Sequence, residues 1–215
     1  MVTVAVVAAA LYLAAHPPGG HSTASGLIPI FGQTVPCPSS LYASDAQYRF
    51  ERCASGVPVA WSRCSTISVS IDSADAPSTW SADTNSALSQ LADATGLRFR
   101  NTPAGGADIT IAWSDNLMAP KQALADKAGL TQVQFRSTPL GAAITSAGVK
   151  ISTRLQGGSG RQGEVPVLLH ELGHAVGLGH YTGPEVMNPT DQGYPVYQSG
   201  DLAGLAALYQ PHSCS

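Results

Sequence analysis

The feature that most constrains this chain of 215 residues is an eleven-residue stretch, His170 to His180, which reads H-E-L-G-H-A-V-G-L-G-H. On a helix, His170 and His174 are one turn apart, so both imidazoles project from one face and can share a metal ion. A straight helix would next present Leu178, which cannot bind a metal. Gly177 can instead adopt the positive φ that ends a helix, so that the chain turns back and presents His180. The stretch therefore predicts a helix and turn that hold zinc through three histidines.

The predicted site has the composition of a catalytic zinc centre. Three neutral imidazoles leave one position of the ion for water, whereas structural zinc sites are closed by four protein ligands. Glu171 follows the first ligand and can reach that water. The alternative is a buried helix that carries three histidines by coincidence. Against it, five fixed positions occur together and use half of the six histidines in the chain.

The stretch resembles the signature of the metzincin zinc peptidases, H-E-x-x-H-x-x-G-x-x-H. Seven residues after His180, Met187 lies in E-V-M-N-P, which resembles the Met-turn beneath the metal in that family. Among metzincins the chain is most similar to the matrixin-like peptidases of the secreted bacterial type. Residues 58–64, 107–113 and 200–209 also resemble their strands and closing helix, so the likeness covers about residues 48 to 209.

The resemblance implies a zinc-dependent endopeptidase of α+β class with a zincin/metzincin-like fold. Such a fold has a mixed twisted sheet, an active-site helix and a small C-terminal subdomain that ends in a helix. The implied site is one catalytic zinc ion held by His170, His174 and His180, with Glu171 as the catalytic acid–base and Met187 as the structural floor.

Further ions of the family have no evident ligands in this sequence. No histidine lies between Trp113 and the predicted zinc helix, which leaves a second, structural zinc without ligands. Pro189 stands where the metzincins with a tyrosine ligand carry that tyrosine, and Asp191 stands where matrixins carry an aromatic residue. Many relatives bind calcium, but the chain contains no D-x-[DN]-x-[DN]-G loop that would place such an ion.

Composition narrows the expected partners. A net charge of −3 and a pI near 6.0 give no electrostatic reason to expect nucleic acid. We expect a monomer that acts on a peptide or protein, bound in extended form against an edge strand near residues 149–153. Two other functions stay open, namely hydrolysis of cell-wall peptide cross-links and a non-catalytic, zinc-binding extracellular module. No wall-binding module is visible, and binding alone would not need Glu171.

Hydrophobic periodicity predicts the elements around the motif. Apolar and polar residues alternate at 67–71, 97–100, 109–111 and 149–151, which is typical of strands. Residues 81–95 have helical spacing that ends at Gly96, and the zinc helix begins near Pro166. Residues 114–147 have no clear period, and we expect a short helix at 121–128 with loops around it.

The first residues predict export. Residues 2–15 form a run of 14 apolar residues, too short to span a bilayer comfortably and typical of a signal peptide, although no Lys or Arg precedes it. An uncleaved anchor or a buried core segment is the alternative. We therefore expect a signal peptide or anchor at 1–15, a flexible Pro/Gly/Ser-rich lead-in at 16–47, and an extracellular catalytic domain at 48–215.

Four cysteines agree with export. Cys37, Cys53, Cys64 and Cys214 are even in number and form no C-x-x-C pair, which favours disulfides. Of the three pairings, we favour Cys37–Cys53 with Cys64–Cys214. As an alternative, residues 52–58 loosely resemble the cysteine switch P-R-C-G-V-P-D, in which Cys53 would cap the zinc of a latent proenzyme.

Overall fold

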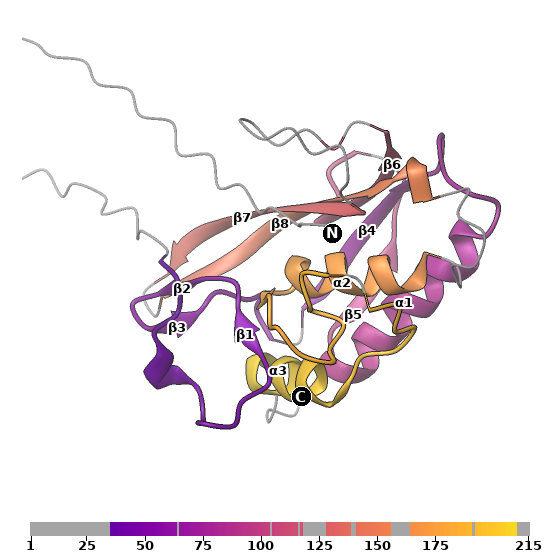
Figure 1. Ribbon diagram of the computed structural model, residues 1–215. Coiled ribbons are helices and arrows are strands. Elements are labelled where there is room, and N and C mark those ends of the chain that lie inside the picture. The colour runs from indigo at the N-terminus through magenta and orange to yellow at the C-terminus, as the bar shows by residue number, and fades with distance from the viewer. Residues whose placement is uncertain are drawn as a thin grey trace, which may run out of the picture.

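A five-stranded sheet forms the framework of the molecule (Figure 1). The computed structural model describes residues 35–63, 65–103, 105–115, 117, 128–138, 141–155, 164–190 and 192–209. In spatial order the strands are β5 (Arg98–Asn101), β4 (Thr66–Asp72), β6 (Ile109–Ser114), β8 (Gly141–Ser152) and β7 (Gly129–Thr138). Neighbouring strands are parallel except β7, which runs antiparallel to β8. The sheet is therefore mixed, as predicted.

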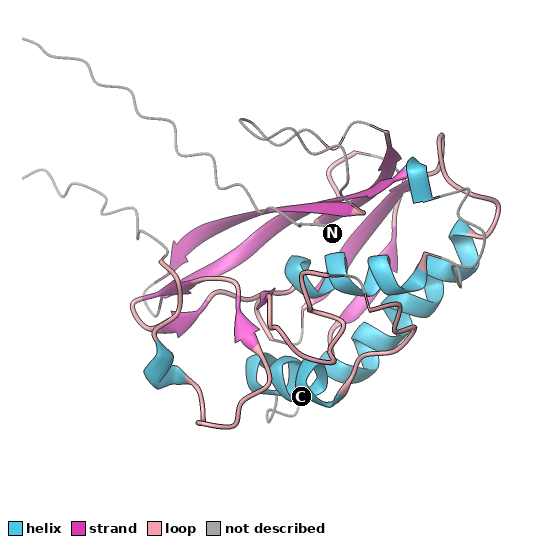
Figure 2. Ribbon diagram, in the orientation of Figure 1, coloured by secondary structure: helices cyan, strands magenta, loops and turns pink. Residues whose placement is uncertain are grey.

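Helices cover one face of this sheet. Helix α1 (Trp80–Thr95) and helix α2 (Val165–Ala175) lie beneath it in Figures 1 and 2, and α3 (Ser199–Tyr209) packs against α1. The core lies between the two layers, where alternate strand residues meet the apolar helix faces; its fully buried members include Ile67, Val69, Ile109, Ile111, Ile151, Leu91, Leu168 and Leu172. The architecture is the α+β class predicted, and residues 176–209 form the small C-terminal part that ends in a helix.

The two predicted helices end and begin for local reasons. Helix α1 ends where Gly96 adopts a φ of 70° and donates its N–H to the carbonyl of Ala92, as the glycine at that position predicts. Helix α2 carries Pro166 in its first turn, where a helix leaves backbone N–H groups without internal partners.

The structure corrects the expectation for residues 129–147. The sequence predicts no regular structure there, but residues 129–138 form β7 and residues 141–147 form the first part of β8, strands of 10 and 12 residues. Small residues such as Ala142, Ala143 and Ala147 hide the alternation in β8. In β7 the alternation of Val133 and Phe135 with polar residues was available as a signal. Residues 118–127, with most of the expected helix at 121–128, lie outside the described residues.

The expectation that residues 149–153 form an edge strand that binds the substrate is also wrong. Residues 149–152 belong to β8, which lies between β6 and β7, and residue 153 begins a short 3-10 helix, η2 (Thr153–Leu155). Hydrogen bonds to both neighbours occupy the backbone of β8 there. Within the described part of the chain, the strand at this edge of the sheet is β7.

The N-terminal part of the domain packs against the chain that follows α2. It contains η1 (Ser39–Leu41), β1 (Arg49–Phe50), β2 (Cys53–Ala54) and β3 (Val57–Pro58), and β1 pairs with β9 (Leu178–Gly179). Residues 35–47, part of the predicted lead-in, are attached through a disulfide and through Tyr42, which packs against Tyr48 and Phe50. The predicted signal peptide lies outside the described residues. Within the described part of the chain, every helix is too short or too polar to span a membrane.

Candidate metal centre

The end of α2 brings the three predicted ligands together. His170 and His174 lie on its last two turns, and the helix ends at Ala175. Gly177 adopts a φ of 110°, as predicted, and its N–H donates to the carbonyl of His174. The chain then reverses through β9 and places His180 opposite the other two histidines.

The three imidazoles converge on one point. Each pair of Nε2 atoms among His170, His174 and His180 is separated by 3.2 Å. Tetrahedral zinc with nitrogen ligands at about 2.0–2.1 Å requires ligand nitrogens about 3.3 Å apart. Among the described residues, this is the one group of three or more such side chains with its donor atoms close enough to hold a metal ion.

Backbone carbonyls decide which nitrogen of each ring faces the centre. The Nδ1–H of His170 donates to the carbonyl of Val186 (2.7 Å), and that of His174 donates to the carbonyl of Leu178 (2.9 Å). Because a carbonyl only accepts, Nδ1 carries the proton in both rings and Nε2 keeps its lone pair. The contact between Nε2 of His170 and Nε2 of His174 is therefore not a hydrogen bond, because both nitrogens present lone pairs to one point, where a cation can bind.

The electrostatic setting also suits a metal. Burial, followed by the charges of His170 and His180, holds the pKa of His174 well below its usual value, so its imidazole is neutral at physiological pH. Neutral imidazole is the form that binds zinc. The residues present therefore fit a zinc ion.

Glu171 is buried between α2 and β7. Its side chain has no exposed surface, and the hydroxyl of Thr131 donates to its Oε2 (2.6 Å). Gly129, two residues earlier on β7, leaves the room that the carboxylate occupies, because a Cβ atom there would lie 2.5 Å from its Oε1. Strand β7 therefore holds the carboxylate in place beside the first histidine.

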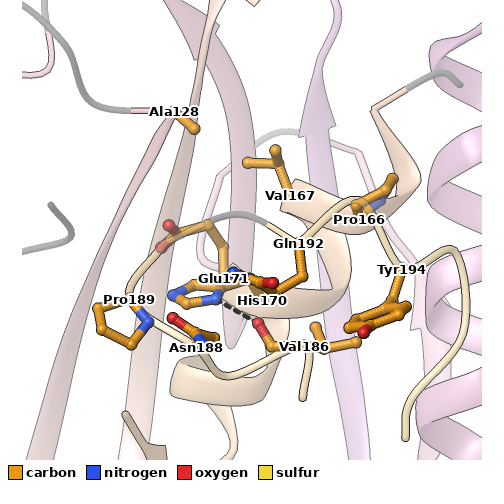
Figure 3. A pocket seen from close by; sticks show the side chains of 10 residues that line it. All are labelled: Ala128, Pro166, Val167, His170, Glu171, Val186, Asn188, Pro189, Gln192 and Tyr194. Atoms are coloured by element: carbon orange, nitrogen blue, oxygen red, sulfur yellow. Dashed lines mark hydrogen bonds between the residues drawn. The ribbon is translucent and has the colours of Figure 1, made fainter. Parts of the chain in front are cut away.

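A pocket opens beside this carboxylate (Figure 3). Glu171 and His170 line it together with Val167, Pro189 and Tyr194. Asp191, where an aromatic residue was expected from the resemblance, lies outside the described residues, whereas Tyr194 supplies an aromatic side chain to the pocket. The site thus combines three imidazoles, a carboxylate and an adjoining, mainly apolar pocket.

Met187 packs on α2 at Gly173, the residue before His174, and a buried carboxylate fixes its turn. The residue is 2% exposed, and its Sδ packs so closely on Gly173 of α2 that no side chain would fit there. Asp201 of α3 accepts hydrogen bonds from the backbone N–H groups of Val186, Met187 and Gln198. Because the carbonyl of Val186 in turn holds His170, Asp201 connects α3 to the metal site.

Three residues that support the site were not identified from the sequence: Gly129, Thr131 and Asp201. The alternation in β7 could have located Thr131 on a strand, and an acidic residue in the first turn of a helix is a usual capping signal for Asp201. No sequence signal indicates that Gly129 faces Glu171, because that contact joins two elements 42 positions apart.

The predicted disulfide between Cys37 and Cys53 is present, with Cα atoms 4.9 Å apart. Since Cys53 is bonded to Cys37, its thiol does not cap the metal, and the switch alternative is not supported. Cys64 and Cys214, the other favoured pair, lie outside the described residues.

In a comparison with protein-family models, a model described as Matrixin matches residues 60–210. These residues include the sheet, the three histidines, the turn at Met187 and α3. No curated protein matches the chain.

Proposed function

Because the chain belongs to the matrixin family of zinc metallopeptidases, we propose that Glu171 acts as general acid–base in peptide-bond hydrolysis at the three-histidine site. The observation that carries the proposal is the convergence of three Nε2 atoms at 3.2 Å from one another, with Glu171 buried beside His170 and lining the same pocket. When bound there, zinc polarises the scissile carbonyl and lowers the pKa of the attacking water.

Glu171 moves the protons of the reaction. Its carboxylate accepts a proton from the attacking water and later delivers it to the nitrogen of the leaving amine. The hydrogen bond from Thr131 to Oε2 and the close packing on Gly129 restrict the carboxylate to one orientation. A fixed carboxylate loses little entropy when the substrate arrives, which favours the reaction.

The substrate is a peptide that binds in extended form along β7. This strand is the sheet edge next to the site, and Thr131, in the same strand, contacts Glu171. A peptide added to this edge would pass the three histidines with its backbone hydrogen-bonded to β7. The pocket lined by Val167 and Tyr194 would then accept one of its side chains.

Export is part of the proposal. The Cys37–Cys53 disulfide is of the kind that persists in oxidising compartments, and the apolar run at 2–15 is typical of a signal peptide. The domain then acts outside the cytoplasm, attached to a membrane only if the apolar run is retained. Fractionation with N-terminal sequencing tests this: soluble cytoplasmic protein that begins at Met1, with reduced Cys37 and Cys53, would contradict export.

Two substitutions test the catalytic assignment. Glu171→Ala leaves the three histidines intact, so we expect full zinc content and a kcat lower by about 10²–10⁴-fold, the usual contribution of a general acid–base. His174→Ala removes a ligand and should lose both zinc and activity. The assignment is wrong if Glu171→Ala keeps more than about a tenth of the wild-type kcat.

The substrate class needs a separate assay. Purified protein is incubated with casein and with purified cell wall, each with and without a zinc chelator. Chelator-sensitive cleavage of casein supports a protein substrate, whereas cleavage of cell-wall peptides alone would redirect the proposal to wall hydrolysis. Failure to cleave either substrate, with zinc bound, would favour a non-catalytic role.

A further inference from the structure

A segment outside the matched residues 60–210 lies directly against the metal-binding turn. Strand β1 pairs with β9, so that Arg49 lies opposite Gly179 and Phe50 opposite Leu178. The next N–H, that of Glu51, donates to the carbonyl of Gly177 (2.8 Å). Residues 49–51 therefore hold residues 177–179, the last three of the five residues that connect the second histidine of the site to the third.

The side chain of Glu51 points at the second histidine. Its Oε2 lies 3.6 Å from Nδ1 of His174, whose side chain is fully buried, while the side chain of Glu51 is 20% exposed. This Nδ1–H already donates to the carbonyl of Leu178 at 2.9 Å. The carboxylate thus faces the N–H edge of the ring, on the other side from the Nε2 that faces the metal site.

Close packing and a covalent bond keep the segment in this place. A Cβ atom at Gly179 would lie 2.9 Å from the carbonyl oxygen of Phe50, so only glycine permits the two backbones to approach this closely. Cys53, two residues after Glu51, is bonded to Cys37.

The same segment also reaches the residue after the third histidine. The guanidinium of Arg49 lies 4.7 Å from the ring centre of Tyr42 and 5.4 Å from that of Tyr181, which follows His180. Contacts of this kind between a cation and an aromatic ring are attractive. The segment therefore touches the metal-binding turn on both sides of its third ligand.

We propose that Glu51 is a positioning residue for the metal site, and that residues 49–53 clamp the turn that carries His174 and His180. The proposal rests on the zinc-binding role of the three histidines. A ligating imidazole becomes a better donor when a carboxylate faces its other nitrogen, and loss of such a partner usually costs 10- to 100-fold in metal affinity or activity. Because the contact of Glu51 is longer than a hydrogen bond, we expect an effect near the lower end of this range.

The test compares two variants of the full chain that each remove one negative charge from the N-terminal part of the domain. Glu51→Gln keeps the size of the side chain, and Asp45→Asn is the control, because Asp45 is exposed and lies outside the strand that pairs with β9. The rate of zinc release to a chelating dye is measured for each loaded protein, and the visible spectrum of each Co²⁺-substituted form reports the ligand field. Thermal unfolding and an intact Cys37–Cys53 disulfide show that each variant is folded.

We expect Glu51→Gln to release zinc about 10-fold faster than wild type and to shift the Co²⁺ bands, with Asp45→Asn unchanged. Glu51→Asp keeps the negative charge but moves it away from the imidazole ring of His174. Its rate of zinc release should therefore lie between those of wild type and Glu51→Gln. Release and spectra equal to wild type in Glu51→Gln, or equal changes in both charge-removing variants, would overturn the role of Glu51. A wild-type protein that takes up no metal would instead overturn the proposed function, and this inference with it.

Discussion

Gly129 sets the position of Glu171, and its replacement by alanine gives a quantitative prediction. The added Cβ would lie 2.5 Å from Oε1 and 2.6 Å from Cγ of Glu171. Carbon atoms in ordinary contact are about 3.5–4.0 Å apart, so the carboxylate has to move by about 1 Å. A displacement of this size can cost about 10²-fold in rate, because the proton acceptor no longer meets the attacking water. We therefore expect Gly129→Ala to lower kcat about 100-fold.

The assay separates displacement of the carboxylate from loss of the fold or the metal. Gly148→Ala on the neighbouring strand β8 is the matched control, because its Cβ would meet only Oγ1 of Thr110, at an ordinary 3.6 Å. We expect the control to keep the wild-type kcat on a peptide substrate, and both variants to keep wild-type zinc content and unfolding temperature. The reasoning is refuted if Gly129→Ala keeps the wild-type kcat, or if it loses activity only together with zinc.

Three further results are expected. Asp201→Ala leaves three backbone N–H groups without their acceptor, including that of Met187. The variant should lower the free energy of unfolding, measured by urea titration, by about 3 kcal/mol. A loss below about 1 kcal/mol would contradict the proposed role of Asp201 in holding the turn at Met187. Burial, opposed by a hydrogen bond from Trp113 and reinforced by the charge of Asp83, raises the pKa of Glu164 above 4.5. The stabilising contribution of Glu164 is therefore present below pH 4.5 and is lost as the pH rises through the raised pKa of the folded state. Glu164→Gln should thus have a higher unfolding temperature than wild type at neutral pH, but not at pH 4. A difference in unfolding temperature that does not depend on pH would refute this. Metal analysis should find one zinc ion per chain, because the described residues offer one ligand cluster, and two tightly bound ions would contradict this expectation.

Much of the fold could be predicted because its signals are local. The helix that ends at Gly96 and the strands β4, β5 and β6 follow from apolar periodicity and a glycine stop. Strand β7 was missed although Val133 and Phe135 alternate with polar residues, because it follows a stretch without periodicity. Its place at the sheet edge follows from its pairing with β8, which only the tertiary structure reveals. This pairing makes β7, and not residues 149–153, the edge strand beside the site.

The candidate site likewise has features that follow from the local sequence and features that follow only from the fold. The spacing of the three histidines and the positive φ of Gly177 are properties of one continuous stretch, so the sequence by itself determined which imidazoles meet and where the helix ends. The even number of cysteines likewise indicated disulfides, of which Cys37–Cys53 is present.

Only the tertiary structure decided what surrounds those imidazoles. Thr131 is 40 positions from Glu171, and Asp201 is 14 positions from Met187, so neither contact can be read from local spacing. Glu51 reaches His174 because β1 pairs with β9, and two paired strands carry no shared pattern when each is two residues long. The physical reason is that a metal-binding motif specifies its ligands through helix geometry, whereas the groups that orient those ligands come from whichever elements the folded core places against them.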